Sequence, residues 1–456
     1  MQAVRRTIPP EILDAFIDEL GRNPAQSDCR CALQQCSFVS RAFRNRAHHY
    51  LFSKVEFVQR PYSTPSEILS RLWQFRNIVH RGTRLPMTGL LHHLRSFKLV
   101  MDGSIFEAYA ILENEDLVEI LRAIQVSSKD FEAFAIHGSS FPIVWPDLTT
   151  DFRAVFRNLC RTMPNLTTLN LVNIVGVPHT LLMRTNIRDI RFHLIEFKKP
   201  RMAFVIFREG HLPKGQLESI DIDYTFPFPP SNLIESRLAY EDAMAHYRTI
   251  FSQVKKLRYL IYRSDDLERF IAVARGLSSS LEVVNLELTN SDNGFLRALS
   301  WEIPLADLPL LRRLIICHKS LISTGTRHPL FKVATVLKNV SVPVCMEAVE
   351  LLFEVSAQAP WLKAMHFFPE PEIWALLDTA LTNRRFDAVR SVVLRLRYCV
   401  SQEPPWTFDE GVFIGRCHDL VKDVFPLLAG SKSKKLELVV SFTTGFEEAK
   451  SQINQV

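Results

Sequence analysis

The 456-residue sequence has no run approaching the ~18 apolar residues that a membrane-spanning helix needs. Its first segment, MQAVRRTIPPEIL, lacks the apolar stretch that a secretory signal contains. We therefore expect a protein of the cytoplasm or nucleus that has no membrane partner. In such a reducing compartment the eight cysteines should be free thiols, most of them small buried apolar side chains.

The motifs of common enzymes are also missing, including G-x-G-x-x-G, the P-loop, G-x-S-x-G and H-E-x-x-H. The glycine in LLAGSKSKK (427–435) lacks the second glycine and the spacing of a phosphate-binding loop. No nucleophile, base and oxyanion donor can be assembled from the sequence. We expect a protein that is not an enzyme and needs no cofactor. An enzyme with an unrecognised site in the later part of the chain is the alternative.

Metal binding has one candidate, because Cys29, Cys31 and Cys36 precede His48 and His49. The C-x-C spacing is not the usual zinc pair, and no second clean pair follows it. Cys36 also falls on the apolar face of an expected helix, where a buried thiol is common. We expect no metal site.

Positive charge is too sparse to favour nucleic acid, since the net charge is only +6 over the whole chain. The densest short run, SKSKK (431–435), is interpreted as a solvated loop. The arginines and histidines of residues 41–49 are expected to face water, opposite an apolar stripe. Nucleic acid is therefore not an expected partner.

Two short amphipathic helices are expected in the first 55 or so residues. In IPPEILDAFIDEL (8–20) the prolines suit a first helical turn, and the apolar residues that follow form one helical stripe. A second apolar face runs from Leu33 to Phe43. Helices this short are unstable alone in water, so they must pack against each other or against another protein.

After Pro61 a pattern of the form apolar-x-x-apolar-x-apolar recurs at intervals of roughly 20–50 residues. The segments are LRSFKL (94–99), FEAFAI (131–136), LTTLNL (166–171), IRDIRF (187–192), LESIDI (217–222), LRYLIY (257–262), LEVVNL (281–286), LRRLII (311–316), LKAMHF (362–367), VRSVVL (389–394) and KKLELVV (434–440). Their alternation is typical of a strand with one buried face.

Amphipathic helical segments lie between these strands, for example at 116–124, 151–163, 241–254 and 266–277. The alternation predicts an α/β fold in which residues 59–456 form an irregular solenoid with parallel strands inside and helices outside. A leucine-rich repeat usually places an asparagine after its strand, and that regular asparagine is missing here. An ordinary α/β domain is the alternative.

The N-terminal region resembles a specific family. IPPEILDAFIDEL, followed by LQQCSFVSRAFRNRAHHYLFSKVEF (33–57), is similar to the F-box-like domain common in proteins of mushroom-forming fungi. In this chain Ile8 stands at the usual leucine and Phe43 where tryptophan is common, and the loop at 21–32 is longer than is typical. A loosely leucine-rich region behind the box strengthens the resemblance, which implies a three-helix unit over residues 1–58.

The resemblance implies that this unit docks on a Skp1-like adaptor and, through it, on a cullin of a ubiquitin ligase. By position, the adaptor-binding residues would be Ile8, Pro9, Pro10, Ile12, Leu13, Ile17, Cys36, Val39 and Phe43. The first six would belong to the first helix, and the other three would sit in the second and help form the shared core. These side chains could also serve to hold the three helices together, and both roles are compatible. A unit this small cannot hide all of its apolar surface.

Family members of this type are substrate receptors, so the resemblance implies that the repeat region binds an unknown protein substrate. Candidate target-binding residues on the open face of the sheet are Lys98, Arg191, Asp221, Tyr259, Arg263, Arg313, Phe368 and Arg395. Their mixed charges indicate no single ligand class. The alternative function is a protein-binding scaffold that has the box fold without a ligase role.

Overall fold

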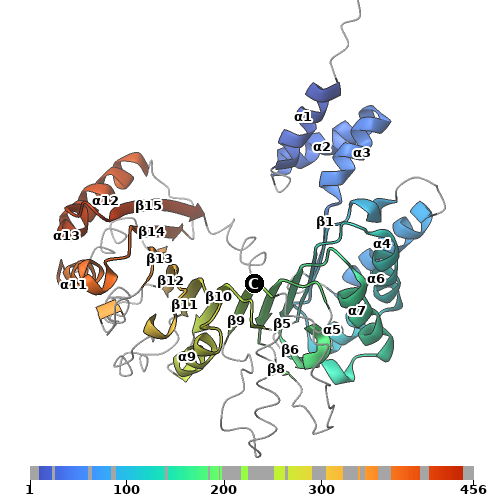
Figure 1. Cartoon of the computed structure of the whole chain (residues 1–456). Coiled ribbons are helices and arrows are strands. Elements are labelled where there is room, and N and C mark those ends of the chain that lie inside the picture. The colour runs from blue at the N-terminus through green and yellow to red at the C-terminus, as the bar shows by residue number, and fades with distance from the viewer. Residues whose placement is uncertain are drawn as a thin grey trace, which may run out of the picture. The chain divides into compact units, whose positions relative to one another are not determined.

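The computed structural model describes most of the chain as an α/β protein, shown in Figure 1. The described residues are 10–22, 26–59, 64–83, 89–138, 142–182, 185–194, 196–197, 217–223, 251–261, 265–289, 305–321, 337–338, 345–357, 371–400 and 410–444. The chain divides into two compact units, Met1–Arg201 and Met202–Val456. The boundary expected between residues 58 and 59 falls inside the first unit and stays a prediction.

The first unit begins with three helices. They are α1 (Pro10–Arg22), α2 (Ser27–Val39) and α3 (Arg41–Leu51). Ser40 has an extended backbone and its side chain accepts a hydrogen bond from the backbone N–H of Phe43, which starts α3. The expected second helix therefore ends at Val39, and Phe43 belongs to the third helix rather than the second.

A small apolar core holds these helices together. Ile17, Leu33 and Ala47, one from each helix, are fully buried, and five partly buried side chains pack around them. Those five are Leu20, Cys36, Phe43, Tyr50 and Leu51. The helices are stabilised by this shared core, as expected for segments too short to persist alone.

The rest of the first unit alternates strands with helices. Its main strands are β1 (Lys54–Val58), β2 (Ser96–Val100), β3 (Ala133–His137), β5 (Thr168–Val172) and β7 (Asp189–His193). Its helices are α4 (Pro65–Thr83), η1 (Leu90–His93), α5 (Ile105–Leu112), α6 (Glu115–Ser127), η2 (Trp145–Asp147), α7 (Thr150–Thr162) and η3 (His179–Leu182). A second small sheet contains β4 (Ile143–Val144), β6 (Ile174–Val177) and β8 (Glu196–Phe197), which the sequence did not lead us to expect.

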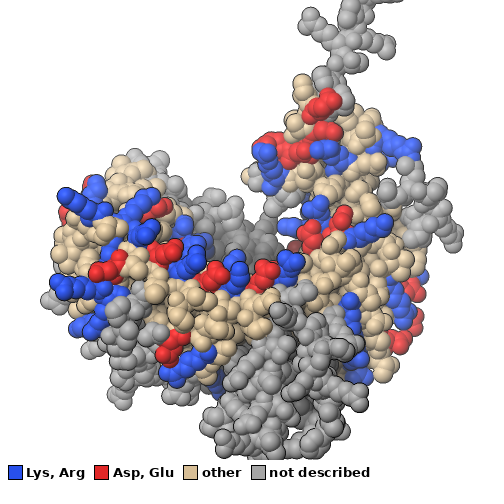
Figure 2. Space-filling model, viewed as in Figure 1, with Lys and Arg blue, Asp and Glu red and all other residues tan. Residues whose placement is uncertain are grey.

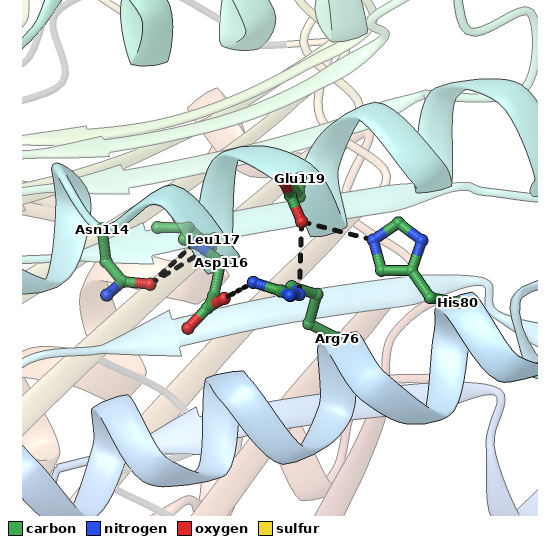
Figure 3. A network of polar contacts seen from close by, with 6 residues as sticks. All are labelled: Arg76, His80, Asn114, Asp116, Leu117 and Glu119. Atoms are coloured by element: carbon green, nitrogen blue, oxygen red, sulfur yellow. Dashed lines mark hydrogen bonds and ion pairs between the residues drawn. The ribbon is translucent and has the colours of Figure 1, made fainter.

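Helices α4, α6 and α7 lie side by side along one face of these strands (Figure 1). Charged side chains join α4 to α6: Arg76 forms ion pairs with Asp116 and Glu119, and His80 Nε2 lies 3.3 Å from Glu119 Oε2 (Figure 3). The Asn114 side chain caps α6 by accepting hydrogen bonds from the backbone at 116 and 117. This network joins α4 to α6 within the helix layer.

The second unit repeats the same arrangement. Its strands are β9 (Ser219–Asp223), β10 (Lys256–Ile261), β11 (Val283–Thr289), β12 (Arg313–Leu321), β13 (Ala348–Ala357), β14 (Ser391–Val400) and β15 (Lys435–Thr444). Its helices are α9 (Asp265–Gly276), η5 (Leu305–Asp307), α11 (Pro371–Thr382), η7 (Arg384–Phe386), α12 (Glu410–Val424) and α13 (Pro426–Ala429).

Within each unit the described main strands pair in parallel, β1 to β7 in the first and β9 to β15 in the second, and each sheet keeps the order of its strands along the chain. Nine of the eleven expected strand segments contain a described strand in phase with the pattern, and LKAMHF lies outside the described residues. The pattern also fits FSKVEF (52–57) and MEAVEL (346–351), which contain β1 and the start of β13 and were not among the expected segments. Of the expected helices, α6, α7 and α9 are present, while most of 241–254 lies outside the described residues.

The expected segment LRYLIY has its strand, but its phase was wrong. Leu257 is in register with Ile220, so the leading buried residue is Val254 and the correct segment is VKKLRY (254–259). Tyr259 therefore takes the position of Ile222 and points into the core. The expected segment began three residues too late. Because successive side chains of a strand point to opposite faces, a shift by an odd number of residues assigns core residues to the surface and surface residues to the core.

The helix-covered side of the sheet forms the core, and phenylalanine is prominent in it. Phe97 and Phe134 stack in neighbouring strands with ring centroids 5.7 Å apart, and Phe134 meets Phe156 of α7 at 5.3 Å. The alternate residues of each strand lie on the other face, which we call the open face. Many of the described phenylalanines thus serve internal packing.

Candidate interaction surfaces

The three-helix bundle exposes four large apolar side chains. Ile12 and Phe16 of α1 are 60% and 55% exposed, and Phe38 and Val39 at the end of α2 are 77% and 68% exposed. Ile12 and Phe16 are four residues apart and share one face of α1. We call these four residues the exposed apolar set. Several large exposed apolar side chains on one small unit are typical of a surface that binds another protein.

The expected adaptor-binding residues are divided by the structure into surface and interior. Ile12 and Val39 are on the surface, and Leu13 is half-buried. Ile17 is fully buried, so it holds the helices together and is not available to a partner. Cys36 and Phe43 pack partly against the core. Pro10 starts α1, whereas Ile8 and Pro9 lie outside the described residues.

Phe16 and Phe38 are surface residues that were not among the expected adaptor-binding ones. Phe16 belongs to the apolar stripe of 8–20, but the sequence does not reveal which edge of a broad stripe meets the bundle core. Phe38 lies beside Val39 in α2, directly before the break at Ser40. Because the backbone is extended at Ser40, α2 ends at Val39 and α3 does not continue along its axis. No further helical turn therefore follows Phe38 and Val39 to cover their side chains.

Arg46, one of the cations of 41–49 that were expected to face water, is 40% exposed and also pairs with acidic side chains of α1. Its Nε and Nη2 atoms donate to the two carboxylate oxygens of Asp18 at 2.7 and 2.6 Å, and Nη1 donates to Asp14 at 3.0 Å. Tyr50 also donates to Asp18, at 2.9 Å. The hydrogen bond from Arg46 is the main reason that the pKa of Asp18 falls to about 2. This network joins α3 to α1.

Histidines gather where the bundle meets the 3-10 helix η1. The ring of His93 lies 6.4 Å from that of His48 and 6.2 Å from that of His49, centroid to centroid. Burial, with His92, His49 and His48 nearby, lowers the pKa of His93 to about 4. These rings are therefore packing groups at neutral pH, when they are uncharged.

The zinc candidate finds no support in the described part of the chain. Cys29, Cys31 and Cys36 lie on α2 and His48 and His49 on α3, and no group of histidine, cysteine or acidic side chains among the described residues has the geometry of a metal site.

No helix among the described residues is both long and apolar enough to cross a bilayer.

The SKSKK run is not wholly a solvated loop. Lys434 is buried, and its Nζ donates to the backbone carbonyl oxygen of Leu381 at 2.7 Å. Its neighbours Lys432 and Lys435 are exposed. The run therefore supplies one structural lysine, which a charge count cannot separate from the solvated ones.

The open face in the first unit brings two expected target-binding residues into one row. Lys98, Ala135, Asn170 and Arg191 are in register on β2, β3, β5 and β7. Lys98 Nζ also pairs with Glu56 of β1 at 2.9 Å. Next to this row His137 is buried, and that burial lowers its pKa to about 3. His137 is therefore an uncharged side chain beside this row at neutral pH.

The open face in the second unit carries ion pairs between neighbouring strands. Arg258 lies between Asp221 and Glu287, with Nη1 3.1 Å from the Asp221 carboxylate and Nη2 in direct contact with that of Glu287. Arg313 and Arg395 both bind Glu350. Figure 2 shows basic and acidic side chains alternating over these strands.

Five of the eight expected target-binding residues lie on the open face: Lys98, Arg191, Asp221, Arg313 and Arg395. Tyr259 is an error, since it is buried in the core and contacts Phe270. Arg263 and Phe368 lie outside the described residues. Arg258 and Glu350 were missed, although each is the residue between the last two apolar positions of a correctly phased segment.

No known family model matches the chain, and no curated protein is detectably similar to it in sequence.

Proposed function

We propose that the chain is the substrate-receptor subunit of a ubiquitin ligase of the Skp1–cullin–F-box type. In this proposal the bundle α1–α3 is an F-box-like unit that binds a Skp1-like adaptor. The strands and helices that follow belong to an irregular leucine-rich-repeat-like solenoid that binds a protein substrate. The chain has no catalytic role of its own, and it raises the concentration of target lysines near a ubiquitin-charged enzyme.

The exposed apolar set is the observation that carries the proposal. Fully burying one phenylalanine or isoleucine side chain contributes about 1.5–3 kcal/mol, so the exposed fraction of each residue could still contribute about 1–2 kcal/mol on binding. A three-helix unit whose own core has only three fully buried side chains gains little from keeping four more in water. A partner with an apolar surface is the simplest reason to retain them.

The repeat region supports the second half of the proposal. In the second unit, parallel strands follow one another in chain order, each in register with the last. Successive structural repeats that each contact mainly the neighbouring repeats are typical of solenoids. Solenoids present one continuous face to large ligands, and the paired charges on the open face are suited to recognising a polypeptide rather than a small molecule.

Co-purification with a Skp1-like adaptor tests the proposal. The full chain and the variant Phe16→Asp with Phe38→Asp are each expressed with the adaptor and separated by gel filtration. We expect the adaptor to co-elute with the wild type and to be lost from the variant, because a carboxylate would be buried in an apolar contact.

Phe106→Asp is the matched control, because Phe106 of α5 is 82% exposed and lies outside the bundle. This variant should retain the adaptor. If all three proteins bind equally, the adaptor contact does not lie on Phe16 and Phe38. If the wild type does not bind the adaptor, the proposal fails. The scaffold function without a ligase role would then account better for the exposed apolar set.

A further inference from the structure

Two arginines on the open face of the second unit share one carboxylate. Arg313 of β12 and Arg395 of β14 lie on either side of β13, whose Glu350 accepts from Arg313 Nη2 on Oε2 and from Arg395 Nε on Oε1. Glu350 is in register with Ile315 and Val393. Each arginine is two residues from that row along its strand, so all three charged side chains share a face.

The carboxylate lies deep and the guanidinium groups lie outside it. The side chain of Glu350 is 10% exposed, whereas those of Arg313 and Arg395 are 48% and 41% exposed. Burial alone would raise the pKa of Glu350, but the hydrogen bonds from the two arginines lower it below its ordinary value. The trio therefore carries two positive charges and one negative charge at neutral pH, a net excess of one positive charge.

Two other ion pairs on this face, both among the described residues, lack that excess. Arg258 binds two acidic side chains, and Arg397 binds Glu354 one to one at 2.8 Å. Each guanidinium has five N–H donors, and Arg313 and Arg395 each use one of them on Glu350. Several N–H donors of each guanidinium group are therefore not used by Glu350 and lie at the surface. They project from β12 and β14, the two strands on either side of β13.

We propose that Arg313 and Arg395 together bind an anionic side chain, a carboxylate or a phosphate, in an acidic segment of a partner polypeptide. Charge complementarity selects this occupant, because the exposed outer layer of the trio is positive while its negative charge is buried. Planar guanidinium groups bind carboxylate and phosphate oxygens through paired hydrogen bonds. Glu350 holds both arginines in place before the ligand arrives, which limits the entropy lost on binding.

The inference rests on the proposed function only in identifying this polypeptide as the ligase substrate. Binding of the acidic segment itself does not depend on the adaptor. The two ideas can therefore fail separately, and the experiment below measures them separately.

Fluorescence anisotropy with short labelled peptides tests the inference on the full chain. The probes are a glutamate–glycine peptide, the same peptide with phosphoserine in place of glutamate, and the same peptide with glutamine. We expect the wild type to bind one or both anionic probes and to bind the glutamine probe at least tenfold more weakly. The better of the two anionic probes identifies the source of the charge.

The test variants are Arg313→Gln and Arg395→Gln, studied singly so that Glu350 keeps one partner. Each should weaken binding of the anionic probe about tenfold, as expected for the loss of a charge-assisted hydrogen bond. Arg275→Gln is the control, because it removes the same charge at a different place. Arg275 of α9 is exposed and pairs with Asp307 at 2.8 Å. It should leave the affinity within about twofold of the wild type.

Arg313→Lys keeps a positive charge beside Glu350 but lacks the planar hydrogen-bonding fork, so it separates the effect of the fork from that of charge alone. It should bind the probe more weakly than the wild type and more tightly than Arg313→Gln. Equal binding of the three probes would overturn the inference, as would equal weakening by the Arg275 and Arg313 variants. If adaptor co-purification survives in these variants while the probe does not bind the wild type, the inference fails and the proposed function stands.

Discussion

Ile12 and Ile17 lie on the same helix and provide a sharp test of how the bundle divides between core and surface. Ile17 is fully buried with Leu33 and Ala47, and Ile12 is 60% exposed. Ile17→Ala removes three buried carbon atoms at about 0.8 kcal/mol each and leaves a cavity, so we expect a loss of about 3 kcal/mol. Ile12→Ala removes mostly solvated carbon atoms and should cost less than about 0.5 kcal/mol.

Hydrogen exchange followed by mass spectrometry measures this in the full chain, because it reports the bundle peptides separately from the rest. About 3 kcal/mol corresponds to roughly a hundredfold faster exchange of the most protected amides in α1 and α3. Ile12→Ala should change those rates less than about threefold. Equal acceleration by both substitutions would refute the division into a buried and an exposed side of α1.

Two further predictions follow from polar groups at the helix contacts. The pKa of Asp18 is about 2 in the folded chain against 3.8 ordinarily, so this carboxylate stabilises the bundle above about pH 4, and the contribution is lost as the pH falls towards 2. Because the pair is partly solvated we expect only about 1 kcal/mol, and NMR titration should find the Asp18 midpoint near 2, rising towards 3.8 in Arg46→Gln. In the second unit, Asp378 accepts hydrogen bonds from the backbone N–H groups of Leu427 and Leu428 at 2.9 and 3.0 Å. Asp378→Ala leaves both donors unpaired and should cost about 2 kcal/mol, seen as faster exchange at the start of α13, and unchanged exchange there would contradict this role.

Much of the fold could be predicted because one physical pattern repeats. A segment with alternating apolar residues has one face to bury, and the structure contains a strand at nearly every such segment that it describes. The phase was lost at LRYLIY because Leu257, Leu260 and Ile261 give the segment apolar residues on both faces. Burial on both sides of a strand removes the alternation that sets the phase, and Tyr259 was misplaced for that reason.

The polar details of the surfaces depend on tertiary contacts that a single sequence does not show. Arg46 could have pointed to water, and its pairing with Asp18 depends on how α3 packs against α1. Likewise, the sharing of Glu350 by two arginines depends on strands β12 and β14 flanking β13. The sequence placed candidate charges on the open face, but the excess of positive charge is visible only once the partners are known.

The surface of the bundle shows the same limit. An apolar stripe predicts that something covers it, but it does not specify which residues the other two helices cover. Ile17 and Phe16 are adjacent in the sequence and equally apolar, yet one is fully buried and the other is 55% exposed. The helix crossing decides between them, and that geometry depends on the break at Ser40 as well as on the stripe.

The central claim is that exposed apolar side chains on α1 and α2 bind a second polypeptide. Isothermal titration calorimetry of the full chain with a Skp1-like adaptor, repeated at several temperatures, tests it most directly, because burial of apolar surface gives a negative heat-capacity change. We predict such a change for the wild type, and a smaller one with weaker affinity when Phe16 and Phe38 are replaced by serine. Absence of binding, or a heat-capacity change that these substitutions leave untouched, would contradict the claim.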